Sequence, residues 1–428
     1  MDNKNKKASG IALLPILVFL VLFIGTGIIQ NDFYAMPAVV GFLIALVIAF
    51  FQTRHLSFEK KLSIIAKGVG DENIITMCLI FLAAGAFSGA VSQAGGVTST
   101  VNLGLSLLPP QIAVIGLFVI GCFISISMGT SMGTIAALAP IAVGISEKTG
   151  FSMAICIGAV VSGAMFGDNL SMISDTTIAA VRTQGCEMRD KFKQNFFIVL
   201  PAAIATIIIL AFITTGKSFH ISGSLDYNIW QVIPYIFVLV TALIGINVFL
   251  VLLCGTVLSI VVGLSTGAMP IAKMFTSMGE GVTGMYDITV ISILVACISA
   301  LVKENGGFDF ILEKIHKRIH SYKGAEFGIA GLVALVDMAT ANNTIAIVIS
   351  GPIAKDISED YGIEAKRSAS LLDMFASVFQ GIIPYGAQLL SAASLTKLSS
   401  FDIMPYLFYP YLMGVCGIVS ILLPRKKA

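Results

Sequence analysis

Charged residues are scarce in this chain of 428 residues. Lysine, arginine, aspartate and glutamate together make up 12% of it, whereas an average soluble domain has about 25%. The net charge is only +2, which argues against a nucleic-acid partner, since such proteins carry clustered positive charge. So few charges cannot give a soluble fold of this size a polar surface. The composition therefore excludes an ordinary soluble domain.

Residues that bind metals or form disulfides are also few and badly placed for either purpose. The seven cysteines are scattered without any Cys-x-x-Cys pair, and most of them lie in apolar stretches. His316 and His320 share a helical face by their spacing, but they lie in a basic stretch typical of a solvated interfacial helix. There is no His-Glu-x-x-His motif, and Phe166-Gly-Asp168 lacks the first glycine expected of a Gly-x-Gly-Asp protease motif. We therefore expect no cofactor, no disulfide framework and no enzymatic activity.

Long apolar stretches fill most of the chain instead. Hydrophobic residues make up 57% of it, and the mean hydropathy is +0.94. Crossing the hydrocarbon core of a bilayer takes about 20 apolar residues in a helix. Apolar stretches near that length cover residues 11–29, 35–51, 74–93, 195–214, 230–246, 248–266, 286–302 and 402–423. The first is too long for the core of a signal peptide, so we interpret it as a span. The sequence predicts an all-α polytopic protein of a cell membrane, either plasma or inner.

One segment occurs twice. Pro140-Ile-Ala-Val-Gly-Ile-Ser-Glu-Lys-Thr-Gly150 returns 212 residues later as Pro352-Ile-Ala-Lys-Asp-Ile-Ser-Glu-Asp-Tyr-Gly362, with seven of eleven positions identical. Val91, Gly95 and Gly96 reappear as Val302, Gly306 and Gly307 at a shift of 211. Two related halves explain both observations. In a membrane protein, such duplication is typical of transporters built around a pseudo-two-fold axis.

Basic residues predict how the chain is oriented, because cytoplasmic loops are rich in lysine and arginine. Basic clusters occur at residues 4–7, 54–67, 182–193, 303–323 and 425–427. The connections near 30–34, 97–110, 216–228 and 267–284 have few basic residues, and we expect them to be loops facing outward. Both termini are then cytoplasmic.

Two segments, 111–182 and 326–395, are too long and too interrupted for a single span. The first is broken near 129–134, 147–150 and 167–175, and the second near 339–344, 355–367 and 380–386. A re-entrant helical hairpin followed by a discontinuous spanning helix satisfies the orientation in each half. We therefore predict two inverted-topology repeats, 1–217 and 228–428, each with about five transmembrane helices and with hairpin tips near 129–134 and 339–344.

The breaks are where we expect the functional site, because unwound backbone at membrane depth survives only where protein or water satisfies it. Polar side chains cluster there, and carboxylates at that depth are costly enough to indicate function. Asp168 lies between apolar Phe166 and Leu170, and we expect it in a helix break; Asp373 could pair with Lys366 or Arg367. The candidate cation or substrate ligands are Asp168, Asn169, Ser171, Asp175, Thr130, Ser131, Thr134, Asp337, Asn342, Asn343, Thr344, Asp373, Gln380 and Tyr385.

Long motifs at these breaks resemble the NhaC-type sodium/proton antiporter family. They are Gly129-Thr-Ser-Met-Gly-Thr134, Gly167-Asp-Asn-Leu-Ser-Met-Ile-Ser-Asp-Thr-Thr177, Ala341-Asn-Asn-Thr-Ile-Ala-Ile-Val-Ile-Ser-Gly-Pro352 and Gln380-Gly-Ile-Ile-Pro-Tyr-Gly-Ala-Gln388. The resemblance extends from about residue 70 to near the end of the chain. It implies inverted repeats with paired hairpins and exchange of sodium for protons. Some members of that superfamily carry amino acids or organic acids.

The residues and the resemblance together favour a secondary active transporter. A desolvated carboxylate accepts either a proton or a cation, so sodium/proton exchange can run through Asp168, with Asn343 as a further sodium ligand. Sodium and protons are then the transported or coupling ions. The alternative is sodium- or proton-coupled transport of an amino acid or a small organic acid. A single chain with two inverted halves does not suit a channel. The oligomeric state stays open, with a homodimer as one option.

Overall fold

The computed structural model describes residues 8–30, 36–107, 109–172, 174–215, 224–244, 246–316 and 319–423, and this part of the chain is helical. The first half contains η1 (Gly10–Leu13), α1 (Leu14–Gln30), α2 (Ala38–Gln52), α3 (Phe58–Val69), α4 (Glu72–Gln93), α5 (Gly96–Leu107), α6 (Pro110–Met128), α7 (Ser131–Thr149), α8 (Met153–Leu170), α9 (Asp175–Gln184) and α10 (Met188–Thr214). The second half contains α11 (Ile229–Leu243), α12 (Val248–Ser265), α13 (Ile271–Gly284), α14 (Tyr286–Glu304), α15 (Gly307–His316), α16 (Tyr322–Thr340), α17 (Asn343–Tyr361), α18 (Ala365–Ile382), α19 (Ala387–Thr396), α20 (Ser400–Ile403), η2 (Met404–Tyr406) and α21 (Phe408–Leu422).

The 212-residue shift found in the sequence also relates the helices. Adding 212 to the bounds of α6, α7, α8 and α9 gives the bounds of α16, α17, α18 and α19 without any offset. The following segments differ more, because α10 is one long helix whereas α20, η2 and α21 are separate pieces. The duplication is therefore visible in the element order as well as in the residues.

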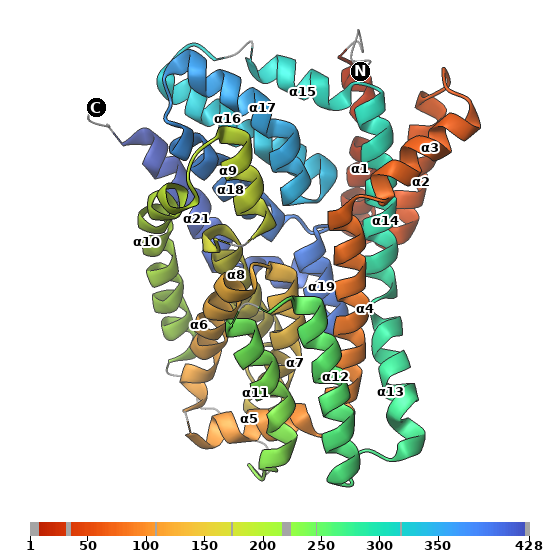
Figure 1. Cartoon of the computed structure of the whole chain (residues 1–428), viewed down its shortest axis with the longest axis vertical. Helices are drawn as coiled ribbons and strands as arrows, with labels where there is room; N and C mark the ends of the chain where they lie inside the picture. The colour runs from red at the N-terminus through yellow and green to blue at the C-terminus, as the bar shows by residue number, and fades with distance from the viewer. Residues whose placement is uncertain are drawn as a thin grey trace.

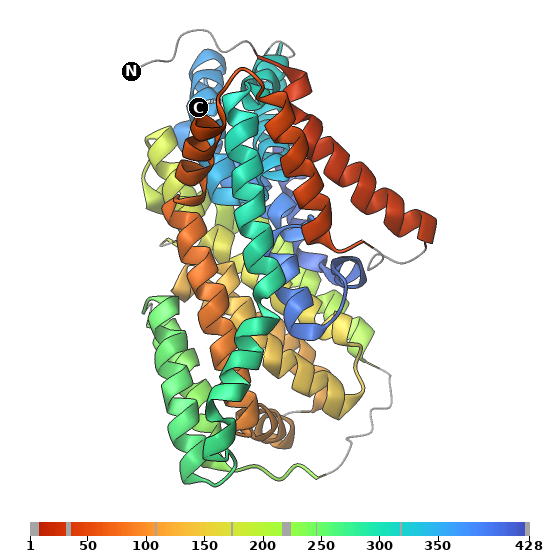
Figure 2. The same cartoon turned by 90° about the vertical axis from the view of Figure 1, so that its right-hand side faces the viewer.

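The two matched hairpins enter the molecule from opposite ends (Figures 1 and 2). The pair α6–α7 rises from the end where α5 lies, here called the α5 end, and turns at mid-height. The pair α16–α17 descends from the end where α15 lies, the α15 end, and turns at mid-height as well. The start of α1 and the end of α21 both lie toward the α15 end. The two tips consequently come together in the middle of the molecule.

Six stretches of the described chain are long and apolar enough to cross a membrane, and two bent pairs raise that number to eight. The six are Gly10–Gly27, Ile74–Gln93, Met153–Gln184, Met188–Thr214, Val248–Ser265 and Ile271–Glu304. One bent pair joins α5 to α6 at 115°, and the other joins Ser400–Tyr406 to α21 at 56°. The prediction of an all-helical, multi-pass membrane protein with bent and re-entrant helices is confirmed at this level.

Two predicted outer loops are helices instead. Residues 97–110 fall largely in α5, where Ser99 donates to Gln231 (2.7 Å) and Asn102 donates to the carbonyl of Asp226 (2.6 Å). Residues 267–284 fall mostly in α13. Gly281 lets α13 approach the backbone of α4 at Gly85, a close contact that small residues allow between membrane helices.

The hairpin tips follow from local capping chemistry. Gly129 and Ala341, which correspond at the 212 shift, both adopt the left-handed conformation, with φ of 68° and 48°, and end α6 and α16. The next residues, Thr130 and Asn342, cap α7 and α17 by accepting from backbone N–H groups three residues later. Each tip is thus a helix end immediately followed by a helix start, which leaves backbone dipoles directed at the centre.

Candidate functional site

A polar cavity of about 90 Å³ lies where the two tips meet the two interrupted helices. Residues from α4, both hairpins and the breaks after α8 and α18 form its wall. They are Thr76, Met77, Ile80, Gly129, Thr130, Ser131, Met132, Asp168, Ser174, Asp175, Thr176, Ala341, Asn342, Asn343, Thr344, Gln380, Ala387 and Gln388. No lysine or arginine is among them. The electrostatics of the wall therefore suit a cation better than an anion.

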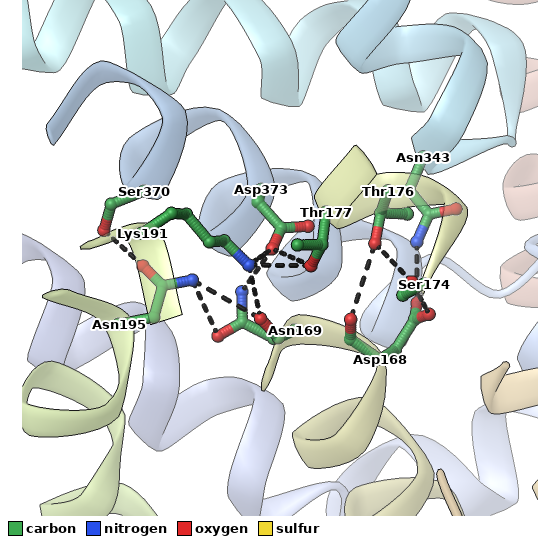
Figure 3. Close-up of polar contacts among 10 residues, drawn as sticks. All are labelled: Asp168, Asn169, Ser174, Thr176, Thr177, Lys191, Asn195, Asn343, Ser370 and Asp373. Atoms are coloured by element: carbon green, nitrogen blue, oxygen red, sulfur yellow. Dashed lines mark hydrogen bonds and ion pairs between the residues drawn. The ribbon is translucent and has the colours of Figure 1, made fainter. Parts of the chain in front are cut away.

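Asp168 connects the two halves at this cavity (Figure 3). Its Oδ1 accepts from the hydroxyl of Ser174 (2.9 Å), and its Oδ2 accepts from the amide of Asn343 (3.0 Å) and the hydroxyl of Ser131 (3.3 Å). Ser131 and Asn343 begin the two matched hairpin helices α7 and α17, so one carboxylate bonds both tips. The side chain is only 4% exposed. A buried carboxylate with three polar neighbours can bind a proton or a small cation.

The predicted position of Asp168 within a helix break is wrong by three residues. Asp168 lies in the last turn of α8, which continues to Leu170. The break begins at Ser171, whose N–H donates to the carbonyl of Gly167 before the backbone becomes extended. The helical position is useful, because it fixes the carboxylate while the unwound residues that follow bring Ser174 to it.

A second chain of hydrogen bonds continues from Ser131 into the other half. Gln388 donates to the hydroxyl of Ser131 (3.1 Å), and Gln380 donates to Gln388 (2.6 Å) and to the carbonyl of Ala341 (3.2 Å). Our sequence analysis did not select Gln388. The sequence analysis did not select Thr176 either, which corresponds to Gln388 at the 212 shift and also lines the cavity.

The structure separates the sequence-predicted ligands into two groups. Those that line the cavity are Asp168, Asp175, Thr130, Ser131, Asn342, Asn343, Thr344 and Gln380. Those outside its lining are Asn169, Ser171, Thr134, Asp337, Asp373 and Tyr385. In the second group, the hydroxyls of Ser171, Thr134 and Tyr385 donate to backbone carbonyls at 2.6–2.9 Å. These three contacts fix the shape of the helices around the site.

Two of the candidate carboxylates differ sharply in their surroundings. Asp175 is exposed at the start of α9 and lies at the rim of the cavity. Asp337 is fully buried in α16, and neither of its carboxylate oxygens has a hydrogen-bond partner among the described residues. Within the described part of the chain, neither carboxylate forms a hydrogen bond to a hairpin tip such as those of Asp168 to Ser131 and Asn343.

Asp373 pairs with a lysine that the sequence analysis placed in a cytoplasmic basic cluster (Figure 3). The ammonium of Lys191 forms an ion pair with Asp373 Oδ2 and donates to the carbonyl of Asn169 (2.6 Å) and to Thr177 (2.8 Å). Both charged side chains are fully buried. Thr177 (3.2 Å) and the Asn169 amide (3.4 Å) also donate to Asp373.

The predicted partners of Asp373 are therefore wrong. Arg367 pairs instead with Glu326 through two contacts, at 2.7 and 3.3 Å, and it also donates to Ser420 (3.0 Å). Lys366 contacts Glu364 at the exposed start of α18. Lys366 and Arg367 precede Asp373 by seven and six residues, nearly two turns of α18, whereas Lys191 reaches Asp373 from α10.

Lys191 could have been found from the spacing of α10. The buried face of this helix contains Lys191, Asn195, Val199 and Ala202, which recur at intervals of three or four residues. Arg189 and Lys193, by contrast, are exposed. Counting basic residues as one loop cluster overlooked the helical face on which each of them lies.

Comparison with known proteins agrees with a membrane transporter. The sequence profile of the Na+/H+ antiporter family matches the chain twice, over residues 5–217 and 215–424. Since these matches cover nearly the whole chain, the protein belongs to this family. The predicted resemblance to the NhaC type is thereby confirmed, and the protein is a transporter and not an enzyme.

Relatives with different named substrates align over almost their full length. The malate-2H+/Na+-lactate antiporter of Bacillus subtilis is 20% identical, over 93% of this chain and 92% of its own. The Na+/H+ antiporter NhaC of Alkalihalophilus pseudofirmus is 22% identical, over 95% and 94%. The arginine/ornithine antiporter ArcD of Halobacterium salinarum is 22% identical, over 98% and 92%. Family membership thus establishes secondary transport but leaves several substrate classes open.

Proposed function

We propose that this protein exchanges sodium ions for protons, with Asp168 as the group that both compete for. The observation that carries the proposal is the buried Asp168 carboxylate, which accepts hydrogen bonds from both hairpin tips at a polar cavity. Sodium is a hard cation and favours oxygen ligands, which the carboxylate and the nearby Ser131, Ser174 and Asn343 side chains can supply.

Exchange follows if only the neutralised carboxylate can pass from one side of the membrane to the other. A bare charge in a low-dielectric environment is costly, and either a proton or a sodium ion removes most of that cost. Loading one ion therefore requires release of the other. A falling pH raises proton occupancy of Asp168, so the apparent affinity for sodium should fall in the same direction.

We further propose that residues 1–217 and 228–428 are inverted-topology repeats, each with about five transmembrane helices, a re-entrant hairpin and a discontinuous helix. The family profile matches twice with nearly these bounds, and the hairpins enter from opposite ends (Figure 1). The basic helix α3 and the connection from α9 to α10 lie toward the α15 end. That end is then cytoplasmic, together with both termini.

The size of the cavity favours an ion over an organic substrate. Pockets that enclose small organic molecules typically measure about 300–1,000 Å³, whereas this cavity measures about 90 Å³. Its lining also lacks the arginine or lysine that a carboxylate substrate would favour. The names of two relatives give malate, lactate, arginine and ornithine as substrates. Transport of an amino acid or an organic acid is therefore the alternative function.

A larger cavity lies beside the second hairpin, on the side of the α15 end. It measures about 460 Å³, and its lining includes Lys67 and Glu304 at one end and Thr340 at the hairpin. In the first half, α7 packs against α4. The corresponding helices of the second half, α17 and α14, both line the larger cavity and make few direct contacts with each other. We propose that this conformation admits ions from the cytoplasmic side.

The test is sodium-driven dissipation of a pH gradient in proteoliposomes that contain the Asp168→Asn variant. Asparagine keeps the shape and one oxygen but cannot release a proton, so exchange should fall at least a hundredfold while the protein still folds. Asp356→Asn, which neutralises an exposed carboxylate on α17, is the matched control and should exchange normally. Normal exchange by well-folded Asp168→Asn would contradict the proposal.

Substrate class is decided in the same vesicles. The unmodified protein should show a sodium affinity that weakens about tenfold per pH unit where protons occupy the site, as simple competition requires. Uptake of radiolabelled malate, lactate, arginine or ornithine, with no sodium-driven proton movement, would favour the alternative.

A further inference from the structure

The ion pair between Lys191 and Asp373 lies beside the proposed transport site without lining its cavity. Asp168 and Asn169 are neighbours at the end of α8, and Thr176 and Thr177 are neighbours at the start of α9. Asp168 contacts Ser174 and the Asn343 tip, whereas Asn169 and Thr177 face Lys191 and Asp373 (Figure 3). The two carboxylates therefore lie on opposite sides of one helix break.

The surroundings of the Lys191 ammonium are those of a small cation site. Three oxygens from three different residues accept its three N–H groups: a main-chain carbonyl, a hydroxyl and a carboxylate. Asn195 extends this shell, because it donates to both oxygens of Asn169 and its own oxygen accepts from Ser370. The other oxygen of Asp373 is buried and has no hydrogen-bond partner among the described residues. A lysine ammonium is a compact point charge, so it can take the place of a monovalent metal ion.

Counting charge around the break shows the consequence. Among the buried side chains, Asp168 and Asp373 contribute two negative charges, and Lys191 contributes one positive charge that is covalently attached; Asp175 at the rim is exposed. One negative charge is left for an exchangeable ion. Without the ammonium, two exchangeable monovalent cations would be needed to neutralise the same carboxylates.

We propose that Lys191 is a built-in cation that permanently occupies a second cation site at Asp373, and so limits the protein to one exchangeable ion at Asp168. This inference rests on the proposed function and adds the origin of its ion stoichiometry. It makes Lys191 a positioning and stoichiometry-determining residue that does not touch the transported ion at Asp168.

The asymmetry between the halves supports this assignment. At the 212 shift, Lys191 corresponds to Ile403 and Asp373 corresponds to Val161, both of which are buried apolar residues. A pair needed only to hold the repeated architecture together would be expected in both halves. The pair instead occurs once, next to the break that contains Asp168.

The experiment counts bound sodium in purified protein by equilibrium binding of radioactive sodium. The unmodified protein should bind one ion, and Asp168→Asn should bind none. Lys191→Met removes the charge and retains the length of the side chain, so it should bind two ions. Lys191→Met combined with Asp373→Asn should return the count to one. Lys193→Met, an exposed lysine on the same helix, is the control and should bind one ion.

A folded Lys191→Met protein that binds one ion would overturn the inference, and so would a second ion that persists in the double variant. If Lys191→Met folds only in sodium and not in choline at equal ionic strength, the result supports the inference, because sodium then replaces the missing charge. Aggregation of Lys191→Met at every sodium concentration, with a stable double variant, counts against it. Failure of the unmodified protein to bind sodium would instead contradict the proposed function itself.

Discussion

At the scale of single residues, three side chains donate hydrogen bonds to the Asp168 carboxylate and form its immediate surroundings. Its carboxylate accepts from Ser131, Ser174 and Asn343, which come from three separate segments. Each donor stabilises the charged carboxylate, and each also carries an oxygen that can turn toward a cation. The affinity for sodium should consequently depend on these three side chains more than on the rest of the lining.

Asn343→Ala should weaken apparent sodium affinity about tenfold, because a hydrogen bond to a charged group is worth roughly 1.5–3 kcal/mol and one oxygen is lost. Maximal exchange should change much less, since the titrating carboxylate remains. The measurement is the sodium dependence of exchange in proteoliposomes. Ser350→Ala is the control and should leave affinity unchanged; its buried hydroxyl on the same helix has no hydrogen-bond partner among the residues that the structure describes. Equal affinities in the two variants would exclude Asn343 as a ligand.

At the scale of elements, each hairpin tip is a helix end and a helix start separated by two residues. This arrangement requires a left-handed residue at the turn, and the two halves meet that requirement differently. Gly129 adopts the conformation without penalty, whereas Ala341 carries a side chain there. The second tip is consequently the more strained of the two.

Ala341→Gly should raise the melting temperature of the purified protein, because left-handed backbone costs a residue with a side chain roughly 1–2 kcal/mol, and only part of that gain is lost to chain entropy. Gly129→Ala should lower the melting temperature by introducing the same strain in the first tip. The control is Ala346→Gly inside α17, which should destabilise by about 1 kcal/mol. A melting temperature for Ala341→Gly as low as that of Ala346→Gly would show that the tip carries no such strain.

At the scale of the whole molecule, the two halves are related in sequence but differ in packing. The first hairpin is closed against α4, whereas a cavity of about 460 Å³ lies beside the second hairpin. If the halves exchange these packings, the access route moves from one side of the membrane to the other. Two copies of one hairpin unit, placed in opposite directions, are well suited to this kind of alternation.

Cysteine labelling tests this asymmetry in a background whose seven native cysteines are replaced by serine. Val348 and Ala136 correspond at the 212 shift, but Val348 is 52% exposed and lines the larger cavity, whereas Ala136 is 2% exposed. A membrane-impermeant maleimide should label Val348→Cys from the cytoplasmic side and leave Ala136→Cys unlabelled. Lys60→Cys on α3 should be labelled from the same side, because the proposed orientation places α3 on the cytoplasmic face. Labelling of Val348→Cys from the outside alone would reverse the proposed orientation.

Several features of this protein followed from the sequence by itself. Helix-length apolar stretches and sparse charge determined that it is a helical membrane protein, because a bilayer permits little else. The repeat that joins Pro140 to Pro352 predicted paired hairpins whose tips, near Gly129 and Ala341, are where the helices turn. The motif around Asp168 indicated the family, which the family profile then established.

Only the tertiary structure decided which polar groups meet. The Lys191 side chain is separated from Asp373 by 182 positions, and nothing in the local sequence selects Asp373 over other carboxylates as its partner. The same holds for Gln388, which comes from α19 and donates to Ser131 at the tip of the first hairpin. Local patterns determine helices and their ends through short-range capping and periodicity. Contacts between distant segments depend on how whole helices pack, and that packing places a lysine predicted for the cytoplasm in the interior of the protein.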